Sequence, residues 1–130
     1  MKKVLVWLDV KEESFDSIPN KYGVYVISCK CKDDKYHVVY TGQSEDIQRR
    51  LKEHWSENET NIDLKEAIVN YRSAFKATYA LVDKKSELDG CEKFLFDYYS
   101  PQFTERAPDV EPTDITLSSS VVKGKVNFKK

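Results

Sequence analysis

Hydrophobic and polar residues alternate along the chain in a way that predicts a small β-sheet. Residues 23–30 (GVYVISCK) and 36–40 (YHVVY) are rich in β-branched and aromatic side chains, and the polar residues 32–35 (KDDK) predict a turn between them. Strands so close in sequence form antiparallel hairpins. Residues 74–82 predict a third strand, and residues 4–10 are a possible further one.

Helical periodicity takes over between and after these strands. Ser44 is a good N-cap for a helix that runs to about residue 55, and residues 63–71 carry apolar side chains on one face. A last helix is predicted over residues 86–99, because Pro101 cannot continue it. The order β-β-α-α-β-α predicts an α+β fold, a small three-stranded antiparallel sheet covered by helices, with N- and C-terminal extensions.

Changes in composition along the chain predict three parts. Residues 1–17 form an N-terminal extension, residues 18–106 a compact domain, and residues 107–130 a proline-containing linker followed by a basic tail. The last ten residues carry four lysines and no acid, and the tail contains one or two strand-like stretches with a turn at Lys123-Gly124. The expected role is a solvated tail. The alternatives are a basic arm that touches a phosphate backbone, and an exposed edge that mediates self-association.

Composition narrows the class of protein. A chain of 130 residues and 15.1 kDa suits one domain, and 40% hydrophobic residues are enough for a core. No apolar run approaches 18 residues, which excludes a membrane span, and the N-terminus does not match a signal peptide, so we expect a cytoplasmic protein. The net charge of −1 means that any contact with nucleic acid depends on a local patch.

The cysteine count argues against both a disulfide framework and a Cys/His zinc site. Three cysteines fit reduced thiols in a cytosol better than a disulfide framework. Only His37 and His54 are available as imidazole ligands, and no four-ligand Cys/His spacing is present.

Arg50 and His54 lie four residues apart, so they sit one above the other on the predicted helix, at the margin of its apolar stripe. A guanidinium beside an imidazole makes a sensible anion site, because the planar fork of arginine matches a phosphate. The alternative is an ordinary amphipathic helix whose border side chains extend to water.

Glu92 is the strongest anomaly, because it lies in the middle of the apolar face of the last helix. A buried carboxylate needs a cation, a set of donors or a cleft. Two interpretations stay open on the residues alone: a Mg²⁺ ligand, or a structural ion pair, for which Arg50 is a candidate partner.

Two short motifs complete the set. Gly23-Val24-Tyr25 opens the first hairpin strand and Tyr40-Thr41-Gly42 closes the second, so that the tyrosines are fifteen positions apart. Taken singly, the tyrosines would be core aromatics and Gly42 a strand-to-helix turn. Arg50 follows Tyr40 by ten residues, His54 comes one helical turn later, and Glu92 falls in the third helix.

This ordered set resembles the GIY-YIG nucleases over roughly residues 18–106. The resemblance implies metal-dependent hydrolysis of DNA phosphodiester bonds, of the kind used in DNA repair or recombination. It makes Tyr25, Tyr40, Arg50, His54 and Glu92 the catalytic residues. Glu92 would hold one Mg²⁺ or Mn²⁺, Arg50 would neutralise charge on the phosphoryl oxygens, and one tyrosine would accept or orient a proton of the attacking water, with His54 relaying the proton or positioning a tyrosine.

The sequence departs from the family at two supporting positions. Family members commonly end in Pro-x-Tyr/Phe-Asn, and here Pro101-Gln102-Phe103-Thr104 replaces the asparagine by Thr104, whose hydroxyl replaces one hydrogen bond of an amide but not both ends. Gln43 stands where repair-type members often carry lysine. Gly23 and Gly42 match the family.

The resemblance therefore leaves two function classes. The first is an endonuclease on DNA, such as branched or damaged DNA, that is structure-specific or targeted by a protein partner. The second is a nucleic-acid-binding or scaffold module that keeps the fold with weak or no turnover, which Thr104 and the near-neutral charge favour.

Overall fold

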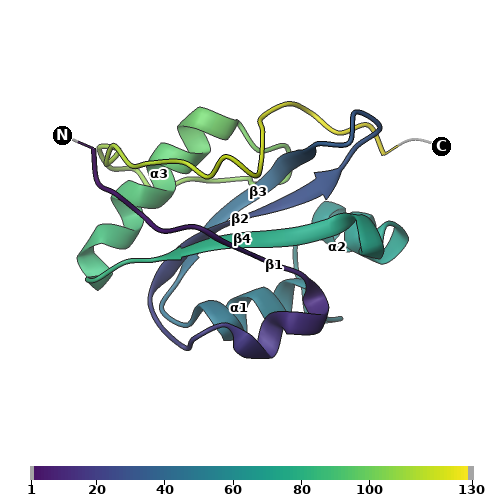
Figure 1. Ribbon diagram of the computed structural model, residues 1–130, viewed down its shortest axis with the longest axis horizontal. Helices are drawn as coiled ribbons and strands as arrows, with labels where there is room; N and C mark the ends of the chain where they lie inside the picture. The colour runs from purple at the N-terminus through teal and green to yellow at the C-terminus, as the bar shows by residue number, and fades with distance from the viewer. Residues whose placement is uncertain (1, 129–130) are drawn as a thin grey trace.

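The structure is a computed structural model that describes residues 2–128 of the chain. It contains four strands, three α-helices and three short 3₁₀ helices (Figure 1). The strands are β1 (Leu8–Val10), β2 (Gly23–Lys30), β3 (Tyr36–Ser44) and β4 (Phe75–Leu81). The helices are α1 (Ile47–His54), α2 (Ile62–Asn70) and α3 (Leu88–Tyr99), with 3₁₀ turns η1 (Glu12–Ser17), η2 (Arg72–Ala74) and η3 (Lys85–Glu87).

The four strands form one antiparallel sheet in the order β1-β4-β2-β3. The predicted α+β class and the β2–β3 hairpin are confirmed, and β1 adds a fourth strand to the three that the sequence predicts. This strand is shorter than residues 4–10, because Leu5 and Trp7 bond to Thr116 instead of to β4. Sequence pattern alone does not reveal this long-range pairing.

Helices cover both faces of the sheet, and side chains of β2 alternate between two cores. Tyr25, Ile27 and Cys29 point into the core shared with α1 and α2, while Val24 and Val26 point into the core shared with α3. Figure 1 shows α3 and α1 on opposite sides of the sheet. Each fully buried aliphatic or aromatic side chain contributes about 1.5–3 kcal/mol to folding. The sheet is therefore packed on both faces, and the β2–β3 hairpin within it carries the two tyrosines.

The predicted starts of two helices are wrong by a few residues. Strand β3 continues to Ser44, which pairs with Gly23, so the N-cap of α1 is Asp46, whose carboxylate accepts the Arg49 N–H at 3.1 Å. The last helix begins at Leu88, because Ser86 lies inside the preceding 3₁₀ turn.

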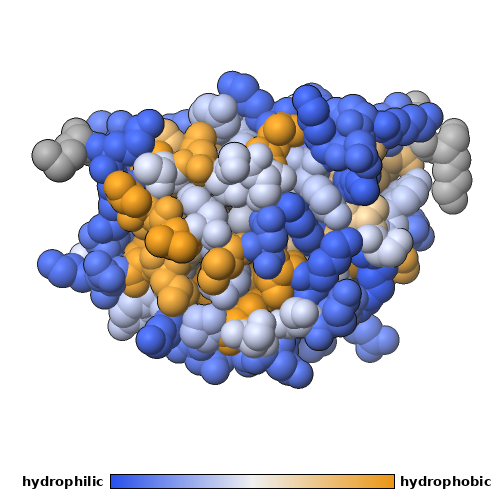
Figure 2. Space-filling view, viewed as in Figure 1, coloured by the Kyte–Doolittle hydropathy of each residue, from blue (hydrophilic) through white to orange (hydrophobic). Residues whose placement is uncertain are grey.

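The N-terminal extension packs into the domain. The ring of Phe15 meets Trp55 edge-on at 4.9 Å between centroids, which ties η1 to the end of α1. Apolar side chains also gather on the surface along the N-terminal segment, where Val4 is 76% and Val6 is 73% exposed (Figure 2). None of the helices in the described part of the chain is long and apolar enough to cross a membrane.

The C-terminal segment is not the solvated tail that the sequence predicts. Its described part, residues 107–128, forms isolated bridges rather than strands, and Val121 is buried. Phe128 stacks between Phe75 and Phe103, at 6.2 and 5.6 Å between ring centroids. Aromatic packing therefore holds the described part of this segment against the domain, and the last two lysines lie outside the described residues.

Candidate active site

The β2–β3 hairpin brings the two predicted tyrosines to the same face of the sheet as α1. Tyr25 is 1% exposed, and the half-buried ring of Tyr40 lies nearly parallel to it at 6.3 Å between centroids. His54, from the end of α1, approaches both rings, at 5.4 Å from Tyr25 and 4.8 Å from Tyr40. Three residues far apart in the sequence therefore form one compact cluster.

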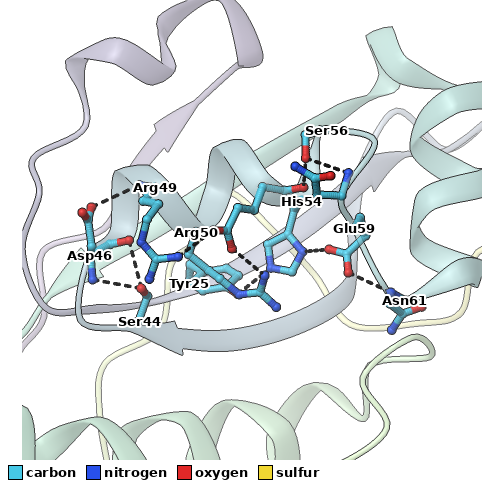
Figure 3. A network of polar contacts seen from close by, with 11 residues as sticks. Tyr25, Ser44, Asp46, Arg49, Arg50, His54, Ser56, Glu59 and Asn61 are labelled. Atoms are coloured by element: carbon cyan, nitrogen blue, oxygen red, sulfur yellow. Dashed lines mark hydrogen bonds and ion pairs between the residues drawn. The ribbon is translucent and has the colours of Figure 1, made fainter.

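A hydrogen-bonded chain runs through this cluster (Figure 3). The hydroxyl of Tyr25 lies 2.6 Å from Nε2 of His54, and Nδ1 of the same imidazole contacts a carboxylate oxygen of Glu59. The other oxygen of Glu59 accepts the backbone N–H of Asn61 at 2.8 Å. Because a charged carboxylate is only an acceptor, His54 carries its proton on Nδ1, and Nε2 accepts the hydroxyl of Tyr25.

The pKa shifts of the three groups agree with this assignment. Burial raises the pKa of Tyr25 well above its ordinary value, so the phenol keeps its proton. Burial lowers the pKa of His54, which favours the neutral imidazole. Burial alone would raise the pKa of Glu59, but the hydrogen bonds from His54 and Asn61 outweigh it and lower the pKa.

Glu59 is a residue that the sequence did not indicate. It lies in the polar loop after α1, where the pattern predicts only turns, and its side chain is 1% exposed. The one available signal is its position five residues after a candidate histidine. Helical periodicity gives no information on side chains in such a loop.

Arg50 lies on α1 beside the tyrosines. Its Nη1 donates to Glu53 at 3.1 Å, and its side chain is 31% exposed. Burial works to lower the pKa of this guanidinium, but the neighbouring Tyr25, Tyr40 and Glu53 raise it. Its positive charge acts in return to lower the pKa of Tyr40, although burial keeps that pKa above its usual value. An arginine has five N–H donors, so the bonds to Glu53 and Tyr40 leave donors for an anion.

Glu92 projects from α3 and is 8% exposed. Burial raises the pKa of this carboxyl group, a hydrogen bond from Gln43 opposes the shift, and the charge of Asp89 adds to it. Its own charge acts to raise the pKa of both Tyr25 and Tyr40. No lysine, arginine or histidine among residues 2–128 forms an ion pair with it. The ion pair with Arg50, one of the two interpretations of the sequence, is therefore not formed.

The supporting residues hold the edges of the site. Gly23 lies against α1 and β4, since a Cβ there would come 2.6 Å from Ile47 and 2.8 Å from the Ala80 carbonyl. Gln43 donates to Asp89 on α3 at 2.6 Å, which links β3 to the helix that carries Glu92.

Thr104 binds the exposed edge of β3. Its hydroxyl accepts the backbone N–H of Thr41 at 2.8 Å and donates to the carbonyl of Thr41 at 3.3 Å. The hydroxyl therefore uses both its donor and its acceptor on one residue, Thr41, where the sequence led us to expect one hydrogen bond. Nearby, the Asn61 side chain donates to the carbonyl of Phe103 at 2.7 Å, which ties this segment to the loop of Glu59.

Comparison with known proteins gives the same answer as the motifs. The sequence model of the family described as "GIY-YIG catalytic domain" matches residues 21–106. The chain belongs to the GIY-YIG family. This match covers the hairpin, the helices and the segment through Thr104, while the predicted domain limits at residues 18 and 106 stay a prediction.

Solved structures show the same fold. One is the GIY-YIG N-terminal endonuclease domain of UvrC from Thermotoga maritima, in a point-mutant form bound to its catalytic divalent cation, with a TM-score of 0.55 and 19% identity over 75% of this chain and 100% of that one. A second point mutant of that domain gives a TM-score of 0.52 at 20% identity, with the same coverage. None of the curated protein sequences compared with the chain gives a match.

Proposed function

We propose that this GIY-YIG domain is a divalent-metal-dependent endonuclease that hydrolyses DNA phosphodiester bonds. The observation that carries the proposal is Glu92, a buried carboxylate without a cationic partner in the described chain, whose charge acts on both tyrosines of the cluster. A structural scaffold gains nothing from such a group, because an unpaired buried charge costs several kcal/mol.

The donor set at Glu92 fits a hard divalent ion. Mg²⁺ and Mn²⁺ prefer oxygen ligands, and Mg²⁺ commonly binds through one or two carboxylates while it keeps its waters. Glu92 would hold the ion, and Gln43 would orient the carboxylate through the hydrogen bond that opposes its pKa shift. When bound, the metal supplies charge stabilisation at the scissile phosphate and the leaving oxygen. The comparison structures, which carry a catalytic divalent cation, support this class of ion.

The solvent exposure of the other side chains decides which catalytic role each of them takes. Arg50 is partly exposed and keeps free donors, so it binds the phosphoryl oxygens and stabilises the negative charge that develops there. Tyr40 is half-buried beside Arg50, so its hydroxyl orients the attacking water or accepts its proton.

Tyr25 has a different role in this proposal. It is sealed from solvent, and its hydroxyl is committed to His54. It therefore positions the ring of Tyr40, and Glu59 fixes the tautomer of His54 that makes this possible.

Targeting is the second part of the proposal. With a net charge of −1, the domain lacks the bulk attraction to DNA of a basic protein. We infer that a feature of substrate shape, as in branched or damaged DNA, or a protein partner directs it.

Cleavage assays with a matched pair of variants test the proposal. Purified protein is incubated with plasmid, branched DNA and RNA, with and without Mg²⁺ or Mn²⁺. Glu92→Gln should remove metal-dependent cleavage while the protein stays folded, and Asp97→Asn, which removes a surface acid of the same helix, should cleave like the unmodified protein. Metal-independent cleavage, or equal cleavage by Glu92→Gln, would refute the assignment. DNA binding without cleavage by the unmodified protein would establish the scaffold alternative.

A further inference from the structure

Three side chains that commonly bind metals meet at the tip of the β2–β3 hairpin, at the end of the strands remote from Gly42. Cys31 and Asp33 belong to the connecting turn, and His37 is the second residue of β3. Their ligand atoms, a thiol sulfur, a carboxylate oxygen and an imidazole nitrogen, all lie within 4.8 Å of one another. Nε2 of His37 and Oδ2 of Asp33 are already 2.9 Å apart. None of the three takes part in the proposed nuclease site.

The turn is folded so that these ligands converge. The N–H of Cys31 donates to the carbonyl of Lys35 at 2.9 Å, and the N–H of Asp34 donates back to the carbonyl of Cys31 at 2.9 Å. Asp34 has a positive φ of 68°, which an aspartate tolerates better than most residues. The backbone therefore fixes the spacing of the ligands without a metal.

The distances suit a small tetrahedral ion. Around zinc, with metal–ligand bonds of about 2.0–2.3 Å, neighbouring ligand atoms lie about 3.3–3.6 Å apart. The 2.9 Å contact between His37 and Asp33 has to lengthen slightly, and the sulfur of Cys31 has to approach from within 4.8 Å. Rotations of the Cys31 and Asp33 side chains suffice for such changes, because Asp33 is exposed and Cys31 partly so.

The chemistry of the ligands selects the ion. A thiolate and an imidazole prefer zinc and similar transition metals, whereas Mg²⁺ takes oxygen ligands. We propose that Cys31, Asp33 and His37 form a site for one zinc-class divalent ion, separate from the Mg²⁺ or Mn²⁺ site at Glu92. Water completes the tetrahedron, since the three residues line a cavity of about 530 Å³.

The C-terminal segment packs against this site. Gly124 has a φ of +130° and lies against the imidazole of His37, so that a Cβ there would come 3.0 Å from Nδ1. Val122 forms backbone hydrogen bonds with Tyr36 and Val38, the two neighbours of His37. The segment thus holds the ring in place, and an ion bound to its Nε2 stiffens the hairpin tip and the segment together.

The sequence did not indicate this site because the zinc signature we expected consists of four Cys and His ligands, and this site has only one of each. An aspartate among lysines in a polar turn carries no metal signal by itself. The spacing Cys31-x-Asp33-x₃-His37 gains its meaning only when the turn is folded.

Zinc binding by the full chain tests the proposal. The protein is stripped of metal with a chelator and titrated with Zn²⁺ in excess Mg²⁺, with a chromogenic chelator as competitor, and then with Co²⁺. We expect one zinc per chain that Mg²⁺ does not displace, and a thiolate-to-cobalt absorption band. Cys31→Ser and Asp33→Asn should each lower the zinc affinity at least about 10-fold. The neighbouring acid change Asp34→Asn and the nuclease-site change Glu92→Gln should leave the affinity unchanged.

The outcomes separate this site from the nuclease site. Unchanged zinc affinity in Asp33→Asn, a substitution at an exposed side chain, would overturn the proposal even if Cys31→Ser fails to fold. A one-to-one complex that is lost in Glu92→Gln would overturn it as well, because the ion would then lie at the nuclease site. Absence of a zinc complex would refute the hairpin site and leave the nuclease proposal intact.

Discussion

The ring of Tyr25 lies directly against the backbone of Gly42 on the neighbouring strand. The two residues pair across the hairpin, and a Cβ at position 42 would come 2.5 Å from both Cζ and the hydroxyl oxygen of Tyr25. The last glycine of the second motif is therefore explained by the first motif, since it leaves room for the tyrosine that reaches His54.

Gly42→Ala should displace Tyr25 and weaken its bond to His54. We expect a loss of about 1–3 kcal/mol in the free energy of unfolding, the usual cost of overpacking, together with reduced cleavage. Denaturant unfolding and the plasmid assay measure the two effects. A double-mutant cycle with Tyr25→Leu supplies the control, because the smaller side chain should remove most of the penalty. An equal penalty in both backgrounds would show that the Gly42 backbone, not the ring, is responsible.

The pair His54–Glu59 predicts that acid destabilises the protein. Both groups have a folded-state pKa below the ordinary value, so the unfolded chain binds more protons as pH falls. Stability should decline below about pH 6.5, where an unfolded histidine takes up its proton, and decline again below about pH 4.5 as the pH approaches the folded-state pKa of Glu59.

Glu59→Gln tests that relationship. It should cost about 1–3 kcal/mol at pH 7, because a glutamine cannot accept from both His54 and the Asn61 N–H, and the loss of stability in acid below pH 4.5 should become smaller. Glu57→Gln, at an exposed acid of the same loop, is the matched control. Identical unfolding curves for the two variants across this pH range would contradict the assigned network.

Glu92→Gln should make the metal-free protein more stable at neutral pH. Burial raises the folded-state pKa of Glu92, so the carboxyl group favours folding below about pH 4.5, and this contribution is lost as pH rises through the folded-state pKa. A neutral amide avoids that cost, and gains of about 0.5–2 kcal/mol are common when a functional group is relieved in this way. Thermal unfolding at pH 7 with chelator present measures it, and a gain that persists at pH 4 would argue against a charge effect.

The C-terminal segment should contribute to stability through Phe128. Phe128→Ala should cost about 2–3 kcal/mol, somewhat less than for a fully buried phenylalanine, because it removes the stack on Phe75 and Phe103. Lys125→Gln, at an exposed position of the same segment, should leave unfolding unchanged. The same Lys125→Gln variant also tests for a phosphate contact, because losing such a contact would make DNA binding less dependent on salt. Equal stability of Phe128→Ala and the unmodified protein would show that the stack makes no net contribution.

The sequence was informative where local pattern decides the structure. The hairpin followed from two β-rich segments around a polar turn, and the spacing from Tyr25 through Arg50 to Glu92 was enough to identify the family. Their individual roles in catalysis stay predictions that the variants above address.

What the sequence could not show depends on contacts between distant segments. Glu59 sits in a loop whose pattern is merely polar, yet it meets His54 because the loop folds back over the end of α1. Thr104 bonds to both the N–H and the carbonyl of Thr41 only because the chain after α3 runs along β3. The stacking of Phe128 is likewise a long-range event that no local periodicity records.

The outermost position of β1 has a practical consequence for shortened versions of the protein. A chain limited to residues 21–106 would lack Leu8–Val10 and leave the outer edge of β4 without its partner from Ala77 to Tyr79. Bare strand edges recruit other chains, so such a fragment should aggregate through intermolecular β-pairing even though every nuclease motif is present. The segment matched by the family model is thus smaller than the unit that completes the sheet.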